Sequence, residues 1–542
     1  MSTMRMASSA FVFLLFGAAP CFDVASQPAF TVRPLVQAGA PFHGVHGLRF
    51  GENGLLYATS VIGQSIFTVA VDDGTIEPVV GPRQGMADDI AIAPDGTLVW
   101  TAIEDGVVYA MPPGGPVRRL WEDRKGVNAV GFSPDGERLF VTLVFYDDAL
   151  YELDLEGDAA PRLILDDIGG LNAFEVGADG MIYGPLYFEG RVVRIDPDGG
   201  AMTTISDAFD TPSALKLAAQ ERAYVVDERR LKRVDLGSGA TSVVAELPSG
   251  GDNLAVRADG RIFVSLAAEN AIVEVDAESG DVRYVVGPTA LTSPAGIAVD
   301  SRGGRDTLYI GDAIGGLRIV DGESGAVEDT PLELFQPAHV SIRGDRLLVV
   351  SEVFGEIQRV DRRTFEVLDE WTGFVVPGDA VEMPEGDVIV AETGTGRLLR
   401  VFGPEPTDRR IIATGLARPR GLAWSDGGAV FVTESALGRL LRINVETGAA
   451  VLVATGLEQP EGVAVMPDGA VIVVEAGARR LKRFDTSGGA GTVAARDLPL
   501  HVADGPSLYR AVGVGSAAIY VASDVDNTIY RLTPRSAPSP GG

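Results

Sequence analysis

The sequence is poor in cysteine, in histidine and in positive charge. Only one cysteine, Cys21, and four histidines occur among 542 residues. A single cysteine excludes an intramolecular disulfide framework, and so few histidines argue against a zinc site built from several imidazoles. The 45 Lys and Arg residues are outnumbered by 75 Asp and Glu residues, which gives a formal net charge of −30. Because phosphate backbones and anionic lipid headgroups repel such a chain, we expect no nucleic-acid partner.

Long apolar runs are lacking as well. The N-terminal run from Ala10 to Ala19 is too short to span a bilayer, so no membrane span is expected. It follows Arg5 and precedes the small residues at 24–26, which is the layout of a secretory signal peptide over residues 1–26. Cys21 lies in this segment. We therefore expect an exported protein, periplasmic or extracellular, whose mature chain has no thiol.

The signature motifs of several enzyme classes are also missing. The sequence has no Gly-x-Ser-x-Gly, P-loop, His-Glu-x-x-His or dinucleotide-binding fingerprint. Serine triads and nucleotide chemistry are therefore disfavoured. In contrast, 67 glycines, 32 prolines and 46% hydrophobic residues indicate a turn-rich globular chain. Its length exceeds that of a single core, which favours several domains or a repeat array.

One pattern recurs through nearly the whole chain: a lead-in residue, an apolar stretch, an Asp-Gly-type turn and a second apolar stretch. Residues 461–475, 420–434 and 252–266 show it clearly. The twelve lead-in residues are His46, Asp88, Asn128, Asn172, Ser213, Asp252, Ala295, Ala338, Asp379, Arg420, Glu461 and Arg510. A spacing of about 42 residues, with β-branched runs separated by short turns, predicts four-stranded propeller blades with strands A to D. Gly or Ala between the apolar positions of strand A indicates close packing of neighbouring blades.

The chain ends suggest how twelve blades divide. The last unit stops after its third strand, 528–532, and an unassigned strand, 30–36, precedes the first unit. We therefore predict an all-β fold of two tandem six-bladed β-propellers, in which strand 30–36 completes blade 6 and strand 282–286 completes blade 12. A 7+5 division is the less favoured alternative. The predicted segments are a signal peptide (1–26), propeller 1 (27–280), propeller 2 (281–534) and a disordered tail (535–542).

In an antiparallel four-stranded blade, the D-to-A and B-to-C connections emerge on one face. The lead-in residues of a ring should therefore converge at one mouth of its channel. In the first ring their carboxylate and amide oxygens suit a hard cation such as Ca²⁺. We predict a divalent metal there, with Asp88, Asn128, Asn172 and Asp252 as ligands. The alternative is that these residues start strands by bonding their own backbone.

The lead-in residues of the second ring differ in charge. Asp379, Arg420, Glu461 and Arg510 alternate in sign, which predicts an ion-pair circuit that closes the channel. Alternatively, the two arginines clamp an anionic ligand. His339 occupies a position that is Gly or Ala in most units, so it is either a core histidine or a general base.

Acidic residues also end strand B throughout the second ring. These residues are Asp312, Glu352, Glu392, Glu434 and Glu475, with Asp524 one place later. They form either a metal funnel or a set of carboxylates, each of which bonds the backbone amides of its own B-to-C turn. Because the acid recurs in every blade, the structural role is favoured over a unique site.

Residues 420–443 and 171–195 resemble the blades of SMP-30/gluconolactonase-like and NHL-repeat propellers, and they look similar to the streptogramin lyase group. The resemblance covers roughly residues 30–534. It implies a six-bladed ring whose channel metal, often Ca²⁺, polarises a lactone or ester carbonyl and activates water. Asn128 and Asn172 match the middle Asn ligands of that family. His46 stands where Glu is expected, and Ser213 stands where Asp is expected.

Three functions therefore stay open. The first is metal-assisted hydrolysis of a lactone or related ester, with His46 and Asp252 as catalytic candidates. The second is a non-catalytic scaffold, in which the loop faces of one or both rings hold a peptide, glycan or partner protein. The third, weaker alternative is a lyase of the streptogramin type, whose basic histidine could only be His46 or His339.

Overall fold

The computed structural model describes residues 29–82, 84–157, 159–332, 336–485, 488–500 and 509–535. The predicted signal peptide and all but the first residue of the predicted tail lie outside them. The described residues form twelve four-stranded antiparallel sheets and two short 3-10 helices, η1 (Ala267–Glu269) and η2 (Ala476–Ala478). The prediction of an all-β chain with twelve four-stranded blades is confirmed. No helix among the described residues is long and apolar enough to cross a membrane.

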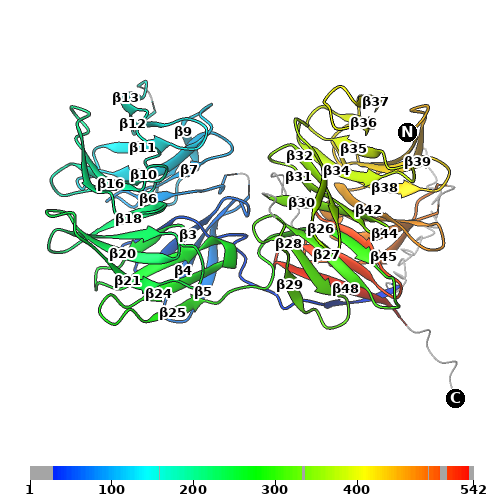
Figure 1. Ribbon diagram of the computed structural model, residues 1–542, viewed down its shortest axis with the longest axis horizontal. Coiled ribbons are helices and arrows are strands. Elements are labelled where there is room, and N and C mark those ends of the chain that lie inside the picture. The colour runs from blue at the N-terminus through cyan, green and yellow to red at the C-terminus, as the bar shows by residue number, and fades with distance from the viewer. Residues whose placement is uncertain are drawn as a thin grey trace, which may run out of the picture.

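The first ring contains β2 to β25 and lies on the left in Figure 1. Its first three sheets are β2 (Leu48–Phe50), β3 (Leu56–Ser60), β4 (Ser65–Ala70), β5 (Thr75–Val80); β6 (Ile90–Ile92), β7 (Leu98–Ala102), β8 (Val107–Met111), β9 (Arg118–Trp121); and β10 (Val127–Phe132), β11 (Leu139–Leu143), β12 (Ala149–Leu153), β13 (Arg162–Asp166). The next three are β14 (Glu175–Val176), β15 (Ile182–Leu186), β16 (Arg191–Ile195), β17 (Met202–Ser206); β18 (Pro212–Ala218), β19 (Arg222–Asp227), β20 (Arg230–Asp235), β21 (Thr241–Glu246); and β22 (Leu254–Val256), β23 (Ile262–Leu266), β24 (Ala271–Val275), β25 (Val282–Val286).

The second ring lies on the right in Figure 1. Its first three sheets are β26 (Pro294–Asp300), β27 (Thr307–Asp312), β28 (Gly316–Asp321), β29 (Val327–Asp329); β30 (Pro337–Arg343), β31 (Arg346–Ser351), β32 (Glu356–Asp361), β33 (Val367–Trp371); and β34 (Pro377–Glu382), β35 (Val388–Glu392), β36 (Arg397–Val401), β37 (Arg409–Ala413). The next three are β38 (Pro419–Ser425), β39 (Ala429–Glu434), β40 (Arg439–Asn444), β41 (Ala450–Thr455); β42 (Pro460–Val465), β43 (Val471–Glu475), β44 (Arg480–Phe484), β45 (Thr492–Ala495); and β46 (Val512–Val514), β47 (Ile519–Ser523), β48 (Thr528–Pro534), β1 (Phe30–Pro34).

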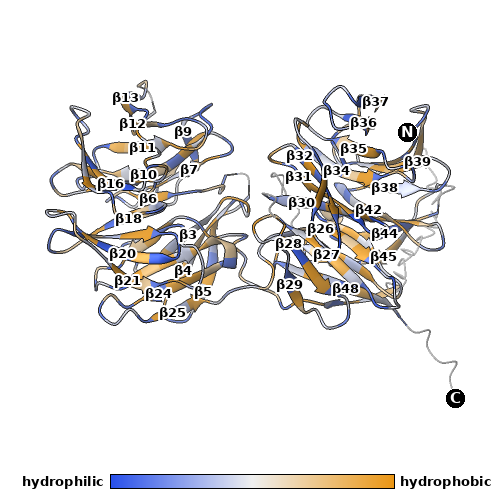
Figure 2. Cartoon of the chain, viewed as in Figure 1, coloured by the Kyte–Doolittle hydropathy of each residue, from blue (hydrophilic) through white to orange (hydrophobic). Residues whose placement is uncertain are grey.

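Each ring closes through its innermost strands. Strand β2 packs against β22 in the first ring, and β26 packs against β46 in the second. Glycine in strand A permits this approach: a Cβ added to Gly296 would lie 2.6 Å from the Cα of His339 in the next blade. Buried apolar side chains pack between neighbouring sheets. In Figure 2 the strands are largely coloured as hydrophobic and the turns as hydrophilic. Trp100, fully buried, stacks on Tyr109 with ring centroids 5.6 Å apart.

The predicted exchange of outer strands between the rings is wrong. Strand β25 stays in the sheet of β22 to β24, and β1 pairs with β48, with Val32 opposite Leu532. A short turn joins β24 to β25, where Asp276 accepts hydrogen bonds from the backbone of Glu278 and Ser279. Strands joined by a tight turn pair at low entropic cost, so β25 has no reason to leave its hairpin.

The domain boundaries change accordingly. The predicted boundary at residue 280 falls within the β24–β25 hairpin, and the first ring instead ends with β25 at Val286. The N-terminal strand belongs to the second ring, because the last blade there has only three strands of its own. Along the chain, the first ring (β2 to β25) is therefore inserted between β1 and the other strands of the second ring.

The segment between β1 and β2 holds the two rings together. The carbonyl oxygen of Ala40 accepts hydrogen bonds from Asn270 of the first ring at 2.7 Å and Asn527 of the second at 2.8 Å. Next to it, the Nε2 atom of buried His43 lies 2.6 Å from the carbonyl oxygen of Asp524. These contacts define a polar seam between the propellers.

Candidate functional site

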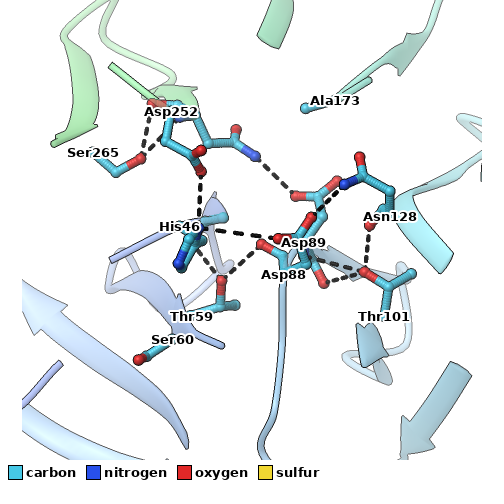
Figure 3. Close-up of polar contacts among 12 residues, drawn as sticks. His46, Thr59, Ser60, Asp88, Asp89, Thr101, Asn128, Ala173, Asp252 and Ser265 are labelled. Atoms are coloured by element: carbon cyan, nitrogen blue, oxygen red, sulfur yellow. Dashed lines mark hydrogen bonds and ion pairs between the residues drawn. The ribbon is translucent and has the colours of Figure 1, made fainter. Parts of the chain in front are cut away.

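Four predicted site residues meet at one mouth of the first ring. His46, Asp88 and Asp252 come from the D-to-A connections of three blades, and Asn128 lies at the start of strand β10 in a fourth. Figure 3 shows their side chains converging. We call this set the acidic mouth. The hydroxyl groups of strand B hold the connections in place: Thr59 Oγ1 donates to the carbonyl oxygen of Asp88 at 3.0 Å.

His46 lies between the two carboxylates of the acidic mouth. Its Nδ1 atom is 3.4 Å from Asp252 Oδ2 and 4.0 Å from Asp88 Oδ1. Burial opposes the charged imidazole, but the attraction and hydrogen bond of Asp252, together with the charge of Asp88, raise the pKa of His46. The acidic mouth therefore favours a positive charge between its carboxylates.

The ionised form of the Asp88 carboxyl group is disfavoured. Burial raises the pKa of Asp88 to about 8, in spite of His46, and the nearby charges of Asp252, Asp89 and Glu104 add to the rise. The Nδ2 atom of Asn128 donates to Asp88 Oδ2 at 2.8 Å. One donor and one shared imidazole thus compensate this carboxylate incompletely.

Two buried polar atoms of the acidic mouth have no hydrogen-bond partner among the described residues. They are Asn128 Oδ1 and His46 Nε2. The Nε2 atom faces the backbone at Gly44, where an added Cβ would lie 3.6 Å from it. Only Nδ1 of His46 faces the carboxylates, so Nε2 does not point along the channel.

Two other lead-in residues of the first ring serve the backbone. Asn172 Oδ1 accepts a hydrogen bond from the backbone of Ala173 at 2.9 Å. Ser213 Oγ donates to the carbonyl oxygen of Gly251 at 3.3 Å. Asn172 is therefore engaged in its own turn, as the structural alternative predicted.

Sequence reasoning missed two residues directly behind the acidic mouth. Buried Asp89 follows the lead-in Asp88, and its Oδ1 accepts a hydrogen bond from Asn253 Nδ2 at 3.2 Å. Its Oδ2 accepts another from the backbone of Val130. The signal was present: Asp89 and Asn253 occupy the position after the lead-in, which is Gly or Ala in the other blades of this ring.

Aromatic side chains lie on the B-to-C turns beside the acidic mouth. Phe145, Tyr187 and Phe188 contact one another edge to face, with centroids 5.4 to 5.7 Å apart, and we call these three residues the aromatic rim. Phe145 and Phe188 are more than half exposed. Burial, and then the charge of Asp252, raise the pKa of Tyr187.

In the second ring, the charged lead-in residues pair within the channel. Arg510, 2% exposed, bonds Glu461 Oε1 at 3.1 Å and Asp524 Oδ2 at 2.6 Å. Arg420 bonds Glu352 at 2.5 Å, across the ring. The predicted circuit joined only lead-in residues. In the structure, two acids at the end of strand B, Glu352 and Asp524, also take part.

The remaining second-ring candidates are enclosed. Asp379 accepts hydrogen bonds from the backbone of Ala380 and Leu422, and burial raises its pKa to about 7. His339 stacks on Tyr509 with ring centroids 3.7 Å apart. Burial, and then the charge of Arg420, lower the pKa of His339, which makes it a poor base at neutral pH.

The other strand-end acids hold the D-to-A connection of their own blade. Asp312 accepts from the backbone of Thr292 and Ser293, and Glu434 accepts from that of Ala417. Glu475 accepts a hydrogen bond from the backbone of Glu458. The carboxylates thus anchor the connections that start strand A, a structural role, but the amides are not those of the B-to-C turn that was predicted. Among the described residues, Asp312 alone of these three also accepts from its B-to-C turn, at Ile314 and Gly315.

Two of the four residues predicted to hold a metal make other hydrogen bonds in this arrangement. No group of three or more His, Cys, Asp or Glu side chains in the described part of the chain is placed to hold a metal ion. Asn128 turns its amide nitrogen toward Asp88, and Asn172 bonds its own turn. The Nδ1 atom of His46 lies between the two carboxylates of the acidic mouth.

Comparisons with known proteins find only distant structural similarity. No protein-family model and no curated protein sequence matches the chain. The extracellular domain of BT4673 from B. thetaiotaomicron, described as a one-component system in one structure and a hybrid two-component system in another, is 11% identical. Its two structures align with 95% and 94% of this chain and 84% and 83% of theirs, with TM-scores of 0.35 and 0.34.

A protein described as a gluconolactonase is 14% identical to this chain. The alignment covers 48% of this chain and 94% of that protein, with a TM-score of 0.37. Similarity at these levels concerns the β-propeller fold alone. The function must therefore be argued from the residues of this chain.

Proposed function

We propose that the protein is an exported, ligand-binding β-propeller that captures a small organic cation at the acidic mouth of its first ring. The observation that carries this proposal is the placement of Asp88 and Asp252 on either side of His46, on the face of the ring that also carries the aromatic rim. Carboxylates neutralise a cation, and aromatic faces attract it through their quadrupoles. The combination suits an alkylated ammonium group.

The electrostatics of the site support the same occupant. The raised pKa of Asp88 reflects a second negative charge that burial opposes. A permanent cation near Asp88 and Asp252 would stabilise the ionised form of both carboxylates. The net charge of −30 also attracts cations from solution and repels anions, which favours encounter with such a ligand.

A matched pair of ligands tests the proposal. Choline carries a quaternary ammonium group, and 3,3-dimethylbutanol is its neutral counterpart of nearly the same shape. We expect calorimetry to detect choline binding that weakens with added salt, and no comparable binding of the alcohol. Equal affinity for the two compounds, or no binding of either, would refute the proposal.

The second candidate is the metal-assisted hydrolysis of a lactone or related ester. The observation that favours it is the buried Oδ1 atom of Asn128, an oxygen without a partner among the described residues, beside two carboxylates. Calcium binding measured by elemental analysis, together with lactone and aryl-ester turnover that EDTA abolishes, would favour this candidate over the first. A streptogramin-type lyase has less support, because His339 is buried and its pKa is lowered.

A further inference from the structure

A separate cavity opens at the other end of the first ring. Its volume is about 670 Å³, within the usual range for small-molecule sites. It is lined by residues from the ends of strands A and from the A-to-B turns, among them Arg49, Lys216, Arg222 and Arg257. The A-to-B turns emerge opposite to the D-to-A connections, so this cavity is distinct from the acidic mouth.

The side chains at one repeated position of strand A shape the cavity. Three residues after the lead-in, four adjacent blades carry Glu175, Lys216, Ala255 and Arg49, in order around the ring. All four line the cavity. Ala255 is the small member of this set, and its short side chain leaves room between the long side chains of Lys216 and Arg49.

Lys216 is the unusual residue of this cavity. It is only 5% exposed, and its ammonium group makes no hydrogen bond or ion pair with the described residues. Burial lowers the pKa of Lys216, although the charges of Asp89 and Glu175 act in the opposite direction. A charge at the end of a nearly buried side chain, without a bonded partner, is costly, and a bound anion would offset this cost.

The other charges of the cavity have partners or are exposed. Glu175 is the acid among the lining residues, and it already bonds Arg49 at 3.4 Å and the backbone of Leu217 at 2.6 Å. Arg257 lies 3.4 Å from Asp259, and Arg222 is exposed at the rim. Four basic residues around one acid stand out in a chain of net charge −30.

From this placement we infer a second ligand site in the first ring, which binds a small anion bearing a carboxylate or phosphate group. Lys216 supplies the buried charge, and the guanidinium groups of Arg49 and Arg222 match the paired oxygens of either group. Phe50 and Tyr224 line the same cavity and can pack against the remainder of such a ligand. This site does not depend on the proposed cation site.

Calorimetric titration with inorganic phosphate and with succinate, in chloride buffers of equal ionic strength, tests the inference. We expect one of the two anions to bind, which also tells a phosphate site from a carboxylate site. Lys216→Met keeps the length of the side chain and removes the charge, so affinity should fall at least about tenfold. Arg222→Gln, at an exposed position that does not endanger the fold, should weaken the same anion less strongly.

Arg119→Gln is the matched control, because Arg119 is exposed on another blade, paired with Glu122. The Arg119→Gln variant should bind the anion with the same affinity as the unaltered protein. Binding of neither anion would overturn the inference. Undiminished anion binding in both Lys216→Met and Arg222→Gln would also overturn it. If Lys216→Met does not fold, undiminished binding in Arg222→Gln alone would overturn it.

Discussion

Asn270 and Asn527 occupy equivalent B-to-C turns in the last blade of each ring and donate to the same atom, the carbonyl oxygen of Ala40. Both are fully buried and both have a positive φ, 56° and 50°. One backbone carbonyl in the segment between β1 and β2 thus bonds to both propellers. Strand β1 itself belongs to the second ring. The two rings are therefore joined by the chain and by buried hydrogen bonds.

We expect Asn527→Ala to weaken the seam. The substitution removes a buried donor and leaves the carbonyl oxygen of Ala40 with one partner, which should lower the free energy of unfolding by about 1–3 kcal/mol. Chemical denaturation measures this loss. Asn53→Ala is the control, because Asn53 is an exposed turn residue, and it should cost less. Equal costs for the two variants would show that the seam does not contribute to stability.

Close packing between blades predicts the effect of a single methyl group. A Cβ at position 296 would lie 2.6 Å from the backbone of His339, whereas one at Gly81 would meet nothing within 4 Å. Gly296→Ala should therefore destabilise the protein by about 1–3 kcal/mol, since the neighbouring blade must move. Gly81→Ala should be close to neutral. A neutral Gly296→Ala would contradict the packing described here.

The charged channel of the second ring predicts a stability effect without a loss of ligand binding. Glu461→Gln removes the charge that Arg510 pairs with and that also attracts Arg420. An uncompensated buried charge costs about 3–5 kcal/mol, and the amide that replaces the carboxylate should recover part of this. We expect a clear decrease in melting temperature and unchanged ligand binding in the first ring. Loss of that binding would indicate that the two channels are coupled.

The acidic mouth predicts a dependence of stability on pH. The pKa values of Asp88 and His46 are both raised, so the folded protein binds these protons more tightly than the unfolded chain. For Asp88 the resulting stability is fully present below its ordinary pKa of 3.8 and is lost as the pH rises toward about 8. For His46 it is present below 6.5 and is lost as the pH passes its raised value.

Asp88→Asn isolates this effect. With rising pH, the melting temperature of the unaltered protein should fall relative to that of Asp88→Asn, because the variant has no carboxyl group to ionise there. Parallel thermal scans of both proteins across this pH range measure the difference. A relative increase with pH would mean that the carboxylate is well compensated and that the description of the acidic mouth is incorrect.

The blades could be predicted from the sequence because each unit repeats its lead-in residue, turn and apolar alternation. The assignment of outer strands could not, because strand counting allows either partner for Phe30–Pro34. The choice depends on the β24–β25 hairpin, in which Asp276 bonds the turn. Local turn chemistry thus decides a question of domain connectivity.

For the candidate site, the rule that lead-in residues converge brought His46, Asp88, Asn128 and Asp252 to one mouth. The same rule does not determine the direction of an amide side chain. Asn172, for example, bonds the backbone of its own turn instead of joining these four residues. Lys216 was overlooked because a lysine in a strand ordinarily reaches solvent, whereas here the ring encloses it.

The central claim is that Asp252 and its neighbours bind an organic cation, and calorimetric titration of choline into Asp252→Asn tests it most directly. Asp259→Asn is the control, because Asp259 is an exposed residue at the other end of the same blade. We predict that Asp252→Asn weakens choline at least about tenfold and that Asp259→Asn leaves its affinity unchanged. Equal choline affinity in both variants, or stoichiometric Ca²⁺ binding that Asp252→Asn abolishes while choline does not bind at all, would contradict the account.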